Sequence, residues 1–185
     1  MTGNHKIYLN RNELFPKISL VTPTYNGVKY LEDTILSVLD QGYPNLEYII
    51  IDGNSTDGSI DLIKKYENRL ACWISEPDKG MYDALQKGFE KSTGEIMAWI
   101  NSDDMYHNKS LFTVAEIFNS CSDIDWLHGT GTAFDESGRT VYCSPGRPFT
   151  KFDLYNRDYK WIQQESVFWR RSLWEKAGSG LNTNL

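Results

Sequence analysis

The sequence predicts an α/β fold: a single domain built on a doubly wound, mostly parallel sheet. Short apolar runs alternate with segments of helical spacing from residue 17 to residue 128. The connections between successive apolar runs are too long for hairpins, so the strands need crossover helices and lie parallel. A chain of 185 residues is long enough to bury the core of one such domain.

Five short apolar segments predict the strands of this sheet. Residues 48–52 are nearly all apolar, as expected for a central parallel strand whose two faces are both covered by helices. The other predicted strands are residues 17–23, 72–75, 95–101 and 124–128. The first of them ends in a proline, which has no backbone N–H to donate and so marks the end of the pairing.

Four segments between these strands place apolar residues at helical spacing. In residues 30–41 the apolar positions that share one helix face are Leu31, Ile35, Val38 and Leu39. The other predicted helices are residues 59–66, 80–92 and 111–119. Residues 1–16 are polar and show little periodicity, so we expect an N-terminal arm ahead of a domain that spans residues 17–185.

The alternation breaks after residue 129. Residues 131–141, with Gly138 in a turn, predict a hairpin. Residues 145–148 predict a loop because they contain two prolines and a glycine. Residues 161–178 hold a short apolar segment and a helix. No repeat, low-complexity tract or linker divides the sequence, which favours one domain.

Composition excludes some classes of protein. The net charge of -6, without a block of basic residues, argues against a nucleic-acid-binding protein. The cysteines Cys72, Cys121 and Cys143 lack C-x-x-C spacing and predict reduced, mostly packed thiols in a cytoplasmic protein. No signal peptide and no run of about 18 apolar residues is found, so we expect no transmembrane segment. Aromatic residues gather between Phe149 and Trp174, where either a lid over the core or a sugar-stacking surface explains them.

Polar segments follow four of the predicted strands, at residues 22–27, 52–58, 76–83 and 101–104. The carboxyl ends of parallel strands meet at one edge of a sheet, and open α/β sheets bind ligands there. Each segment alone is also explained by a turn or a helix cap, and Asp57 suits an N-cap position. Together they predict a nucleotide-diphosphate site with a metal.

The chemistry of these side chains agrees with that interpretation. Asp103 and Asp104 directly follow a buried strand, and paired carboxylates suit a hard divalent cation that also binds a substrate's phosphates. Asp52 ends the second strand and can accept hydrogen bonds from a uracil N–H or a ribose hydroxyl. Tyr25 can stack on a base. A solvated turn that caps the next helix is the structural alternative for the acidic pair.

From residue 17 to about residue 178, the order and spacing of these segments resemble glycosyltransferase family 2, whose members have the GT-A fold. TPTYN at residues 22–26 resembles the opening motif of the family, and DGNSTDG at residues 52–58 resembles its nucleotide loop. DKGMYDA at residues 78–84 resembles a D-x-G-x-Y-D-A segment of one subgroup. NSDD at residues 101–104 stands in place of the D-x-D metal motif, and residues 163–171 resemble an acceptor-side Q-Q-x-x-F-x-R-R segment.

The resemblance implies an inverting transfer of a sugar from a UDP- or GDP-sugar to a hydroxyl of a saccharide or lipid-linked acceptor. Such transfers make cell-surface polysaccharide or glycolipid, and peripheral association with a membrane fits them. Residues 17–104 would bind the nucleotide, and residues 105–185 would face the acceptor. The nucleotide-binding residues that it implies are Thr22, Pro23, Tyr25, Asp52, Asp78, Lys79 and Asp103, with Asp52 on the base.

The implied cofactor is Mn²⁺ or Mg²⁺, brought to the diphosphate by Asp104 with Asp103 close by. A cation there stabilises the charge that grows on the leaving nucleoside diphosphate. The first position of the D-x-D motif is Asn101, so the metal depends on Asp103 and Asp104, or on water.

Inversion also needs a general base that takes the proton of the acceptor hydroxyl. In many relatives this base is an aspartate that follows the segment matching residues 175–178, so we expect it beyond residue 185, in a domain incomplete at its C-terminus. Glu165 is the best base within the sequence. An ion pair with Arg170 or Arg171 is the competing role for its carboxylate.

Two other functions remain as alternatives. The chain is a donor-binding fragment without turnover if the base lies beyond residue 185. It is a different α/β nucleotide enzyme, such as a nucleotidyltransferase, if the loop after the first strand binds phosphates by itself. Residues 22–27 contain no lysine or arginine, which disfavours this last alternative.

Overall fold

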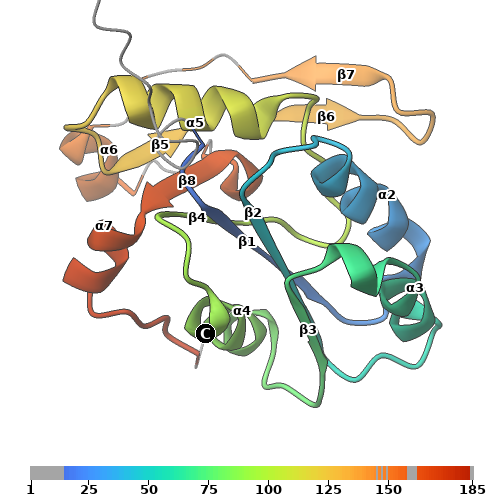
Figure 1. The fold of residues 1–185 in the computed structure, drawn as a ribbon. Coiled ribbons are helices and arrows are strands. Elements are labelled where there is room, and N and C mark those ends of the chain that lie inside the picture. The colour runs from blue at the N-terminus through green and yellow to red at the C-terminus, as the bar shows by residue number, and fades with distance from the viewer. Residues whose placement is uncertain (1–14, 145, 147, 149, 158–161, 184–185) are drawn as a thin grey trace, which may run out of the picture.

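The computed structural model describes residues 15–144, 146, 148, 150–157 and 162–183. Nearly all of the expected N-terminal arm lies outside the described residues, as does part of the loop expected at residues 145–148. A six-stranded sheet in the order β3-β2-β1-β4-β8-β5 crosses the molecule, with helices on both faces (Figure 1). The predicted α/β fold with a mostly parallel sheet is confirmed.

Four strands run parallel. β1 (Ile18–Thr24) pairs with β2 (Leu46–Asp52) and β4 (Ile96–Trp99), and β3 (Cys72–Ser75) pairs with β2. The register places the last residues of β1, β2 and β3 side by side. The loops that follow these strands therefore leave the sheet at a common edge, as the sequence predicted.

The other two strands depart from the expected order. β8 (Val167–Arg170) is antiparallel to both of its neighbours, β4 and β5 (Trp126–His128). The strand expected at residues 124–128 is present, but β8 separates it from β4 and buries Phe168 in the core. The short apolar segment expected within residues 161–178 is this inserted strand.

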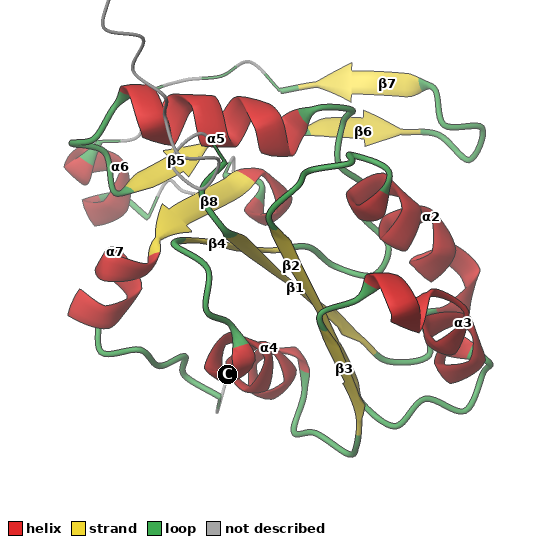
Figure 2. Cartoon of the chain, in the orientation of Figure 1, coloured by secondary structure: helices red, strands yellow, loops and turns green. Residues whose placement is uncertain are grey.

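Three helices cover one face of the sheet and two cover the other (Figure 2). The first set is α2 (Val28–Leu39), α3 (Ser59–Tyr66) and α5 (Ser110–Ser120). The second set is α4 (Met81–Lys91) and α7 (Arg171–Lys176). Successive strand residues point to opposite faces, so Leu20 belongs to the first core cluster and Val21 to the second.

The smaller elements lie around this sheet. They are the 3-10 turns η1 (Glu67–Arg69) and η2 (Gln164–Ser166), helix α6 (Lys151–Tyr155), and the strands β6 (Thr132–Phe134) and β7 (Thr140–Cys143). β6 and β7 form the predicted hairpin. Its turn includes Gly138 at a φ of 76°, a conformation that a residue with a Cβ adopts at a cost.

Two expectations about individual side chains are now resolved. Trp169 and Trp174 pack on Phe89 with ring centroids 5.5 and 5.2 Å apart, so this part of the aromatic cluster covers the core. The cysteines are free, but the expectation that most are packed was wrong, because Cys121 and Cys143 are exposed. In the described part of the chain, no helix combines the length and apolar character that crossing a bilayer requires.

A buried carboxylate fastens the amino end of the sheet. Glu47 is 8% exposed and accepts hydrogen bonds from Lys17 Nζ at 2.5 Å and from the Thr93 backbone N–H at 2.6 Å. Ser19 Oγ also donates to it, and accepts the Gly94 backbone N–H at 2.6 Å. Burial favours the neutral acid, but the hydrogen bonds from Lys17, Ser19 and Thr93 outweigh burial and lower the pKa of Glu47 to about 2.

This network predicts a pH dependence of stability. Because folding lowers the pKa of Glu47 from its ordinary 4.5, the stability that it contributes is complete above pH 4.5 and is lost as the pH falls towards 2. Glu47→Gln keeps the shape and removes the charge. We expect it to lower the free energy of unfolding at pH 7 by about 2 kcal/mol in urea denaturation.

The control is Glu67→Gln, an exposed glutamate on η1. Its effect should stay below about 0.5 kcal/mol. Between pH 4.5 and pH 2, the E47Q protein should lose less stability than the unmodified chain, because the group that takes up the proton is gone. Equal losses in the two proteins would show that this network does not fasten the sheet.

Candidate functional site

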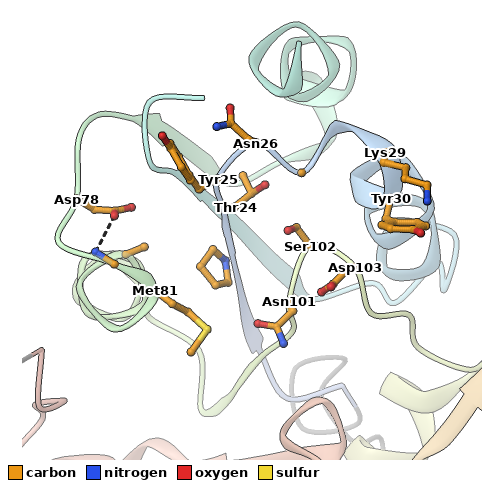
Figure 3. A pocket seen from close by; sticks show the side chains of 14 residues that line it. Thr24, Tyr25, Asn26, Lys29, Tyr30, Asp78, Met81, Asn101, Ser102 and Asp103 are labelled. Carbon is orange, nitrogen blue, oxygen red and sulfur yellow. Dashed lines mark hydrogen bonds between the residues drawn. The ribbon is translucent and has the colours of Figure 1, made fainter. Parts of the chain in front are cut away.

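A cavity of about 730 Å³ opens at the carboxyl ends of β1 and β4. Its lining comes from the loop after β1, the first turn of α2, the start of α4 and the loop after β4 (Figure 3). Four of the residues that the sequence assigned to a nucleotide line it: Pro23, Tyr25, Asp78 and Asp103. The edge of the sheet where the sequence predicted a site therefore has a cavity large enough for a small-molecule ligand.

At the end of β1, Thr24 lines the cavity and Thr22 does not. Thr22 is fully buried, and its Oγ1 lies 3.0 Å from the hydroxyl of Tyr48, so it belongs to the core and does not line the cavity. Thr24 does line it. Its Oγ1 is buried and has no hydrogen-bond partner among the described residues, which leaves a polar atom available to a ligand.

The loops after β1 and β4 come into close contact at Gly27. A Cβ at this position would lie 2.8 Å from Thr24 Oγ1 and 2.9 Å from Ser102 Oγ. Both distances are shorter than a carbon and an oxygen tolerate, so the contact depends on glycine. Because Gly27 has no side chain, the hydroxyl groups of Thr24 and Ser102 can both lie close to it on the wall of the cavity.

The loop after β2 holds the start of α2. The backbone N–H of Asn26 donates to Ser55 Oγ at 2.8 Å, and that of Val28 donates to Asp57 Oδ2 at 3.0 Å. Asp57 Oδ1 also accepts the Ser59 N–H at 3.0 Å. The N-cap of α3 is Gly58, so the expectation that Asp57 takes the N-cap position was wrong, and Asp57 binds the first N–H of this helix from one residue further out. The Val28 N–H is one of the donors at the start of α2 that have no partner within the helix, and here a side chain satisfies it.

Asp52 lies behind this loop and outside the cavity. It is fully buried, and its carboxylate accepts the Ser55 backbone N–H at 3.0 Å and the Ser75 hydroxyl at 2.6 Å. The Ser55 hydroxyl donates to its other oxygen. In this arrangement Asp52 ties the loop to β3, and its contact with a base stays a prediction.

The lysine that lines the cavity is Lys29 and not Lys79, the lysine that the family resemblance implied. Lys79 is exposed and does not line the cavity, whereas Lys29, in the first turn of α2, does. Lys29 lies between the polar segment at residues 22–27 and the predicted helix at residues 30–41, so neither pattern assigned it to the site. Its place just after the glycine of a strand-to-helix loop was the available signal.

The acidic pair lies at the edge of the cavity, and its two members differ. Asp103 is exposed and lines the cavity. Asp104 is half-buried, and its Oδ2 accepts Asn101 Nδ2 at 3.1 Å and Gln164 Nε2 at 2.9 Å. Burial raises the pKa of Asp104 and the charge of Asp103 adds to the rise, while the two amide donors oppose it.

This pair fits a divalent cation that is shared with a ligand. The described residues contain no group of three or more His, Cys, Asp or Glu side chains that would form an all-protein metal site. Mg²⁺ and Mn²⁺ are commonly held by one or two carboxylates together with substrate phosphates. Burial is the main cause of the raised pKa of Asp104, and the neighbouring charge of Asp103 adds to it; a cation would offset the charge of both carboxylates.

A second cleft of about 720 Å³ adjoins the cavity and shares Tyr30 and Asp103 with it. Asp104 and Glu165 also line this cleft. Glu165 is partly buried, and burial, followed by the charge of Asp104, raises the pKa of its carboxyl group. Besides the acidic pair, this cleft therefore holds Glu165 and three other acidic residues, Asp33, Asp135 and Glu136.

The ion pair expected between Glu165 and the two arginines does not form. Arg170 Nη1 lies 3.0 Å from Glu95 Oε1, and the Arg170 Nε–H donates to the carbonyl of Ile124 at 2.8 Å. Arg171 donates to the carbonyl of Gly94 at 2.7 Å. The physical reason is that Arg170 is the last residue of β8, a four-residue strand that spans roughly 10 Å and leads away from the 3-10 turn that holds Glu165.

Residues 19–174 match the family model described as "Glycosyl transferase family 2", which is most of the chain. The chain belongs to glycosyltransferase family 2. The resemblance drawn from the strand-end motifs is thereby confirmed, and the protein is a glycosyltransferase by family.

Curated relatives of this chain are named as glycosyltransferases. TuaG of Bacillus subtilis (strain 168), named for teichuronic acid biosynthesis, is 33% identical over 140 residues, which cover 74% of this chain and 52% of TuaG. An uncharacterized glycosyltransferase of Haemophilus influenzae is 37% identical over 99 residues, 52% of this chain and 40% of its own. The chain spans about half the length of the curated relatives it matches.

Solved structures show the same fold. TarS 1-349 of S. aureus, in complex with UDP, superposes with a TM-score of 0.71 at 22% identity and covers 91% of this chain and 51% of its own. The mannosyltransferase PcManGT of Pyrobaculum calidifontis, in complex with GDP-Man and Mn²⁺, gives 0.65 at 21% identity, covering 92% and 48%. The expected GT-A fold is confirmed.

The close approach at Gly27 is testable without any ligand. Gly27→Ala places a Cβ against Thr24 Oγ1 and Ser102 Oγ, so the two loops must separate. We expect the free energy of unfolding to fall by about 1 to 2 kcal/mol in chemical denaturation. Gly129→Ala is the matched control, because its Cβ would meet Ser166 at an ordinary 3.5 Å. An equal effect of the two substitutions would contradict the contact.

Proposed function

We propose that this glycosyltransferase transfers a sugar from a nucleoside-diphosphate donor to an acceptor hydroxyl, with inversion and with a divalent metal. The observation that carries the proposal is the cavity at the carboxyl edge of the sheet. It is bordered by an acidic pair and contains a buried hydroxyl, that of Thr24, without a partner among the described residues. A ligand with phosphate oxygens and a bound cation satisfies both features.

The donor class is supported by the neighbours in fold. TarS structures contain UDP or UDP-GlcNAc, and the PcManGT structure contains GDP-Man and Mn²⁺. A UDP- or GDP-sugar is therefore the donor that we propose here. The cation, Mn²⁺ or Mg²⁺, would be held by Asp103 and Asp104 and would neutralise the charge that grows on the leaving diphosphate.

The residues of this chain divide the work of holding that donor. Lys29 adds a positive charge beside the cavity, and Thr24 and Ser102 offer hydroxyl groups that donate to phosphate oxygens. Gln164 and Asn101 hold Asp104 by hydrogen bonds to one of its carboxylate oxygens. A fixed carboxylate places the cation without reorganisation during the reaction.

The second cleft is the proposed acceptor side, with Glu165 as the general base. Glu165 lines this cleft and makes no ion pair in the described part of the chain, so its carboxylate is available to an acceptor hydroxyl. Burial raises the pKa of Glu165, which makes the carboxylate a better proton acceptor. The cleft meets the first cavity at Asp103, as transfer between two bound substrates requires.

The biological setting that we propose is the synthesis of cell-surface polysaccharide or glycolipid on the cytoplasmic side. The name of TuaG supports a polysaccharide product, and the free cysteines fit a reducing compartment. The acceptor is a saccharide or a lipid-linked saccharide, which the second cleft faces, and peripheral contact with a membrane suits a lipid-linked acceptor.

Donor binding is the direct test of the first half of this proposal. In calorimetry, UDP or GDP should bind about tenfold more tightly with Mn²⁺ than with EDTA, because the metal links the diphosphate to the acidic pair. Asp103→Asn should remove most of this gain. Asp61→Asn, an exposed aspartate on α3, should leave it intact. Absence of binding by any nucleoside diphosphate would exclude the function.

Transfer tests the second half. Glu165→Gln should lower kcat by about 100-fold or more and leave the Kd of the donor within about twofold, because the base acts only on the acceptor. Glu136→Gln is the control, since Glu136 lines the same cleft but is exposed. Full activity of the E165Q protein would place the base elsewhere. Donor binding without transfer by the unsubstituted chain would favour the donor-binding alternative.

A further inference from the structure

Helix α2 is hydrogen-bonded to the loop that carries the acidic pair. Thr34 Oγ1 donates to the backbone carbonyl of Asp104 at 2.8 Å. About one turn further along the helix, Ser37 Oγ accepts the backbone N–H of Tyr106 at 3.2 Å and donates to the carbonyl of Thr34 at 2.8 Å. Two hydroxyl groups of one helix therefore bind two backbone groups of the loop after β4.

Gln41, just past the end of α2, adds a third contact with this loop. Its Nε2 donates to the carbonyl of His107 at 2.8 Å and to that of Ser37 at 2.9 Å. Positions 34, 37 and 41 are spaced by three and four residues, the spacing of neighbours on one side of a helix. Thr34 is fully buried and Gln41 is 8% exposed, so these hydrogen bonds are largely shielded from water.

The contact with Thr34 complements the hydrogen bonds of the Asp104 side chain. Oδ2 of Asp104 accepts amide donors from Asn101 and Gln164, while its backbone carbonyl accepts the Thr34 hydroxyl. Oδ1 receives no hydrogen bond from the part of the chain that the structure describes. The main chain and the side chain of Asp104 are both held, and one carboxylate oxygen stays available to a cation.

The same helix also contributes to the wall of the cavity. Lys29 and Tyr30, in the first turn of α2, line the cavity together with Asp103 (Figure 3). Tyr30 precedes Thr34 by four residues, so the two share the side of α2 that faces the loop. One rigid helix therefore carries the positive charge of Lys29 and the hydroxyl groups that hold the acidic pair.

We propose that Thr34 and Ser37 are positioning residues for the divalent cation. They do not touch the cation. They hold the backbone of residues 104–106, and through it the acidic pair, in the arrangement that binds a cation shared with the diphosphate. A carboxylate that is already held loses less conformational freedom on binding, so the cation and the donor bind more tightly. The inference rests on the proposed function and deepens it, because it names groups outside the cavity that set the affinity for the metal.

The test measures how much Mn²⁺ improves nucleotide binding in a variant of Thr34. Calorimetry gives the Kd of UDP, or of GDP if GDP is the tighter ligand, with Mn²⁺ and with EDTA. Thr34→Val keeps the shape of the side chain and removes the donor to Asp104. The improvement by Mn²⁺, about tenfold in the unsubstituted protein, should shrink by about fivefold, the factor that one hydrogen bond contributes. The Kd with EDTA should change by less than about twofold.

Three further variants separate positioning from a general loss of stability. Thr34→Ser restores the hydroxyl group and should restore the improvement to within about twofold of the unsubstituted value. Ser37→Ala should reduce the improvement as Thr34→Val does. Ser92→Ala is the matched control, because Ser92 is buried and its hydroxyl also makes two hydrogen bonds, with the carbonyl of Phe89 at 2.7 Å and with Arg171 at 2.9 Å. Ser92 lies at the end of α4 ahead of β4, so S92A should keep the full improvement.

Amide hydrogen exchange at Tyr106 tests the contact without any ligand. Its backbone N–H donates to Ser37 Oγ, and Thr34 holds the same loop at Asp104. In S37A and in T34V this N–H should exchange at least about fivefold faster than in the unsubstituted protein, because local opening of the loop becomes easier. In S92A it should exchange at the unsubstituted rate.

Each outcome separates the inference from the proposed function. A T34V protein that keeps the full improvement by Mn²⁺ overturns the role of Thr34. Equal losses of affinity with Mn²⁺ and with EDTA also overturn it, since a purely structural defect gives that pattern. A protein without substitutions that binds no nucleoside diphosphate, or binds it equally with Mn²⁺ and with EDTA, overturns the proposed function itself. An improvement that is lost in T34V and S37A but kept in T34S and S92A supports the two hydroxyl groups as positioning residues.

Discussion

The site depends on the hydrogen bonds that join the loop after β2 to the loop after β1. Three consecutive backbone N–H groups, of Asn26, Gly27 and Val28, donate to side chains of residues 55, 59 and 57. At a helix start these donors have no partner within the helix, so their satisfaction fixes where α2 begins. These hydrogen bonds also position Thr24 and Lys29, because each of the two lies within three residues of the bonded N–H groups.

A second junction joins the two halves of the site. Asp104 accepts Gln164 Nε2 through its side chain, and its backbone carbonyl accepts the Thr34 hydroxyl at 2.8 Å. One residue of the acidic pair is thus bound both to α2 and to the segment before β8. The inserted strand β8 makes this possible, because it brings η2 next to the loop after β4. The cavity and the second cleft meet at this junction.

The sequence predicted the parts of the site that depend on strand order, since parallel strands deliver their loops to one edge. The sequence did not predict how deeply individual side chains are buried. Thr22 and Thr24 lie on the same side of β1, and only the packing of Tyr48 shows that the first is core and the second faces the cavity. The insertion of β8 between β4 and β5 could not be predicted either, because a short apolar segment fits an edge strand and an inserted strand equally well. The pairing of β8 with β4 and β5 keeps residues 167–170 extended, and this separates Arg170 from Glu165.

In the proposed donor complex, one nucleoside diphosphate spans the cavity from the end lined by Tyr25 and Asp78 to the end lined by Asp103. A crystal structure of the chain with UDP or GDP and Mn²⁺ tests it most directly. We expect the base to stack on Tyr25 and the metal to lie between the diphosphate and Asp103 or Asp104. Density for the nucleotide outside this cavity, or in the reverse orientation, would contradict it.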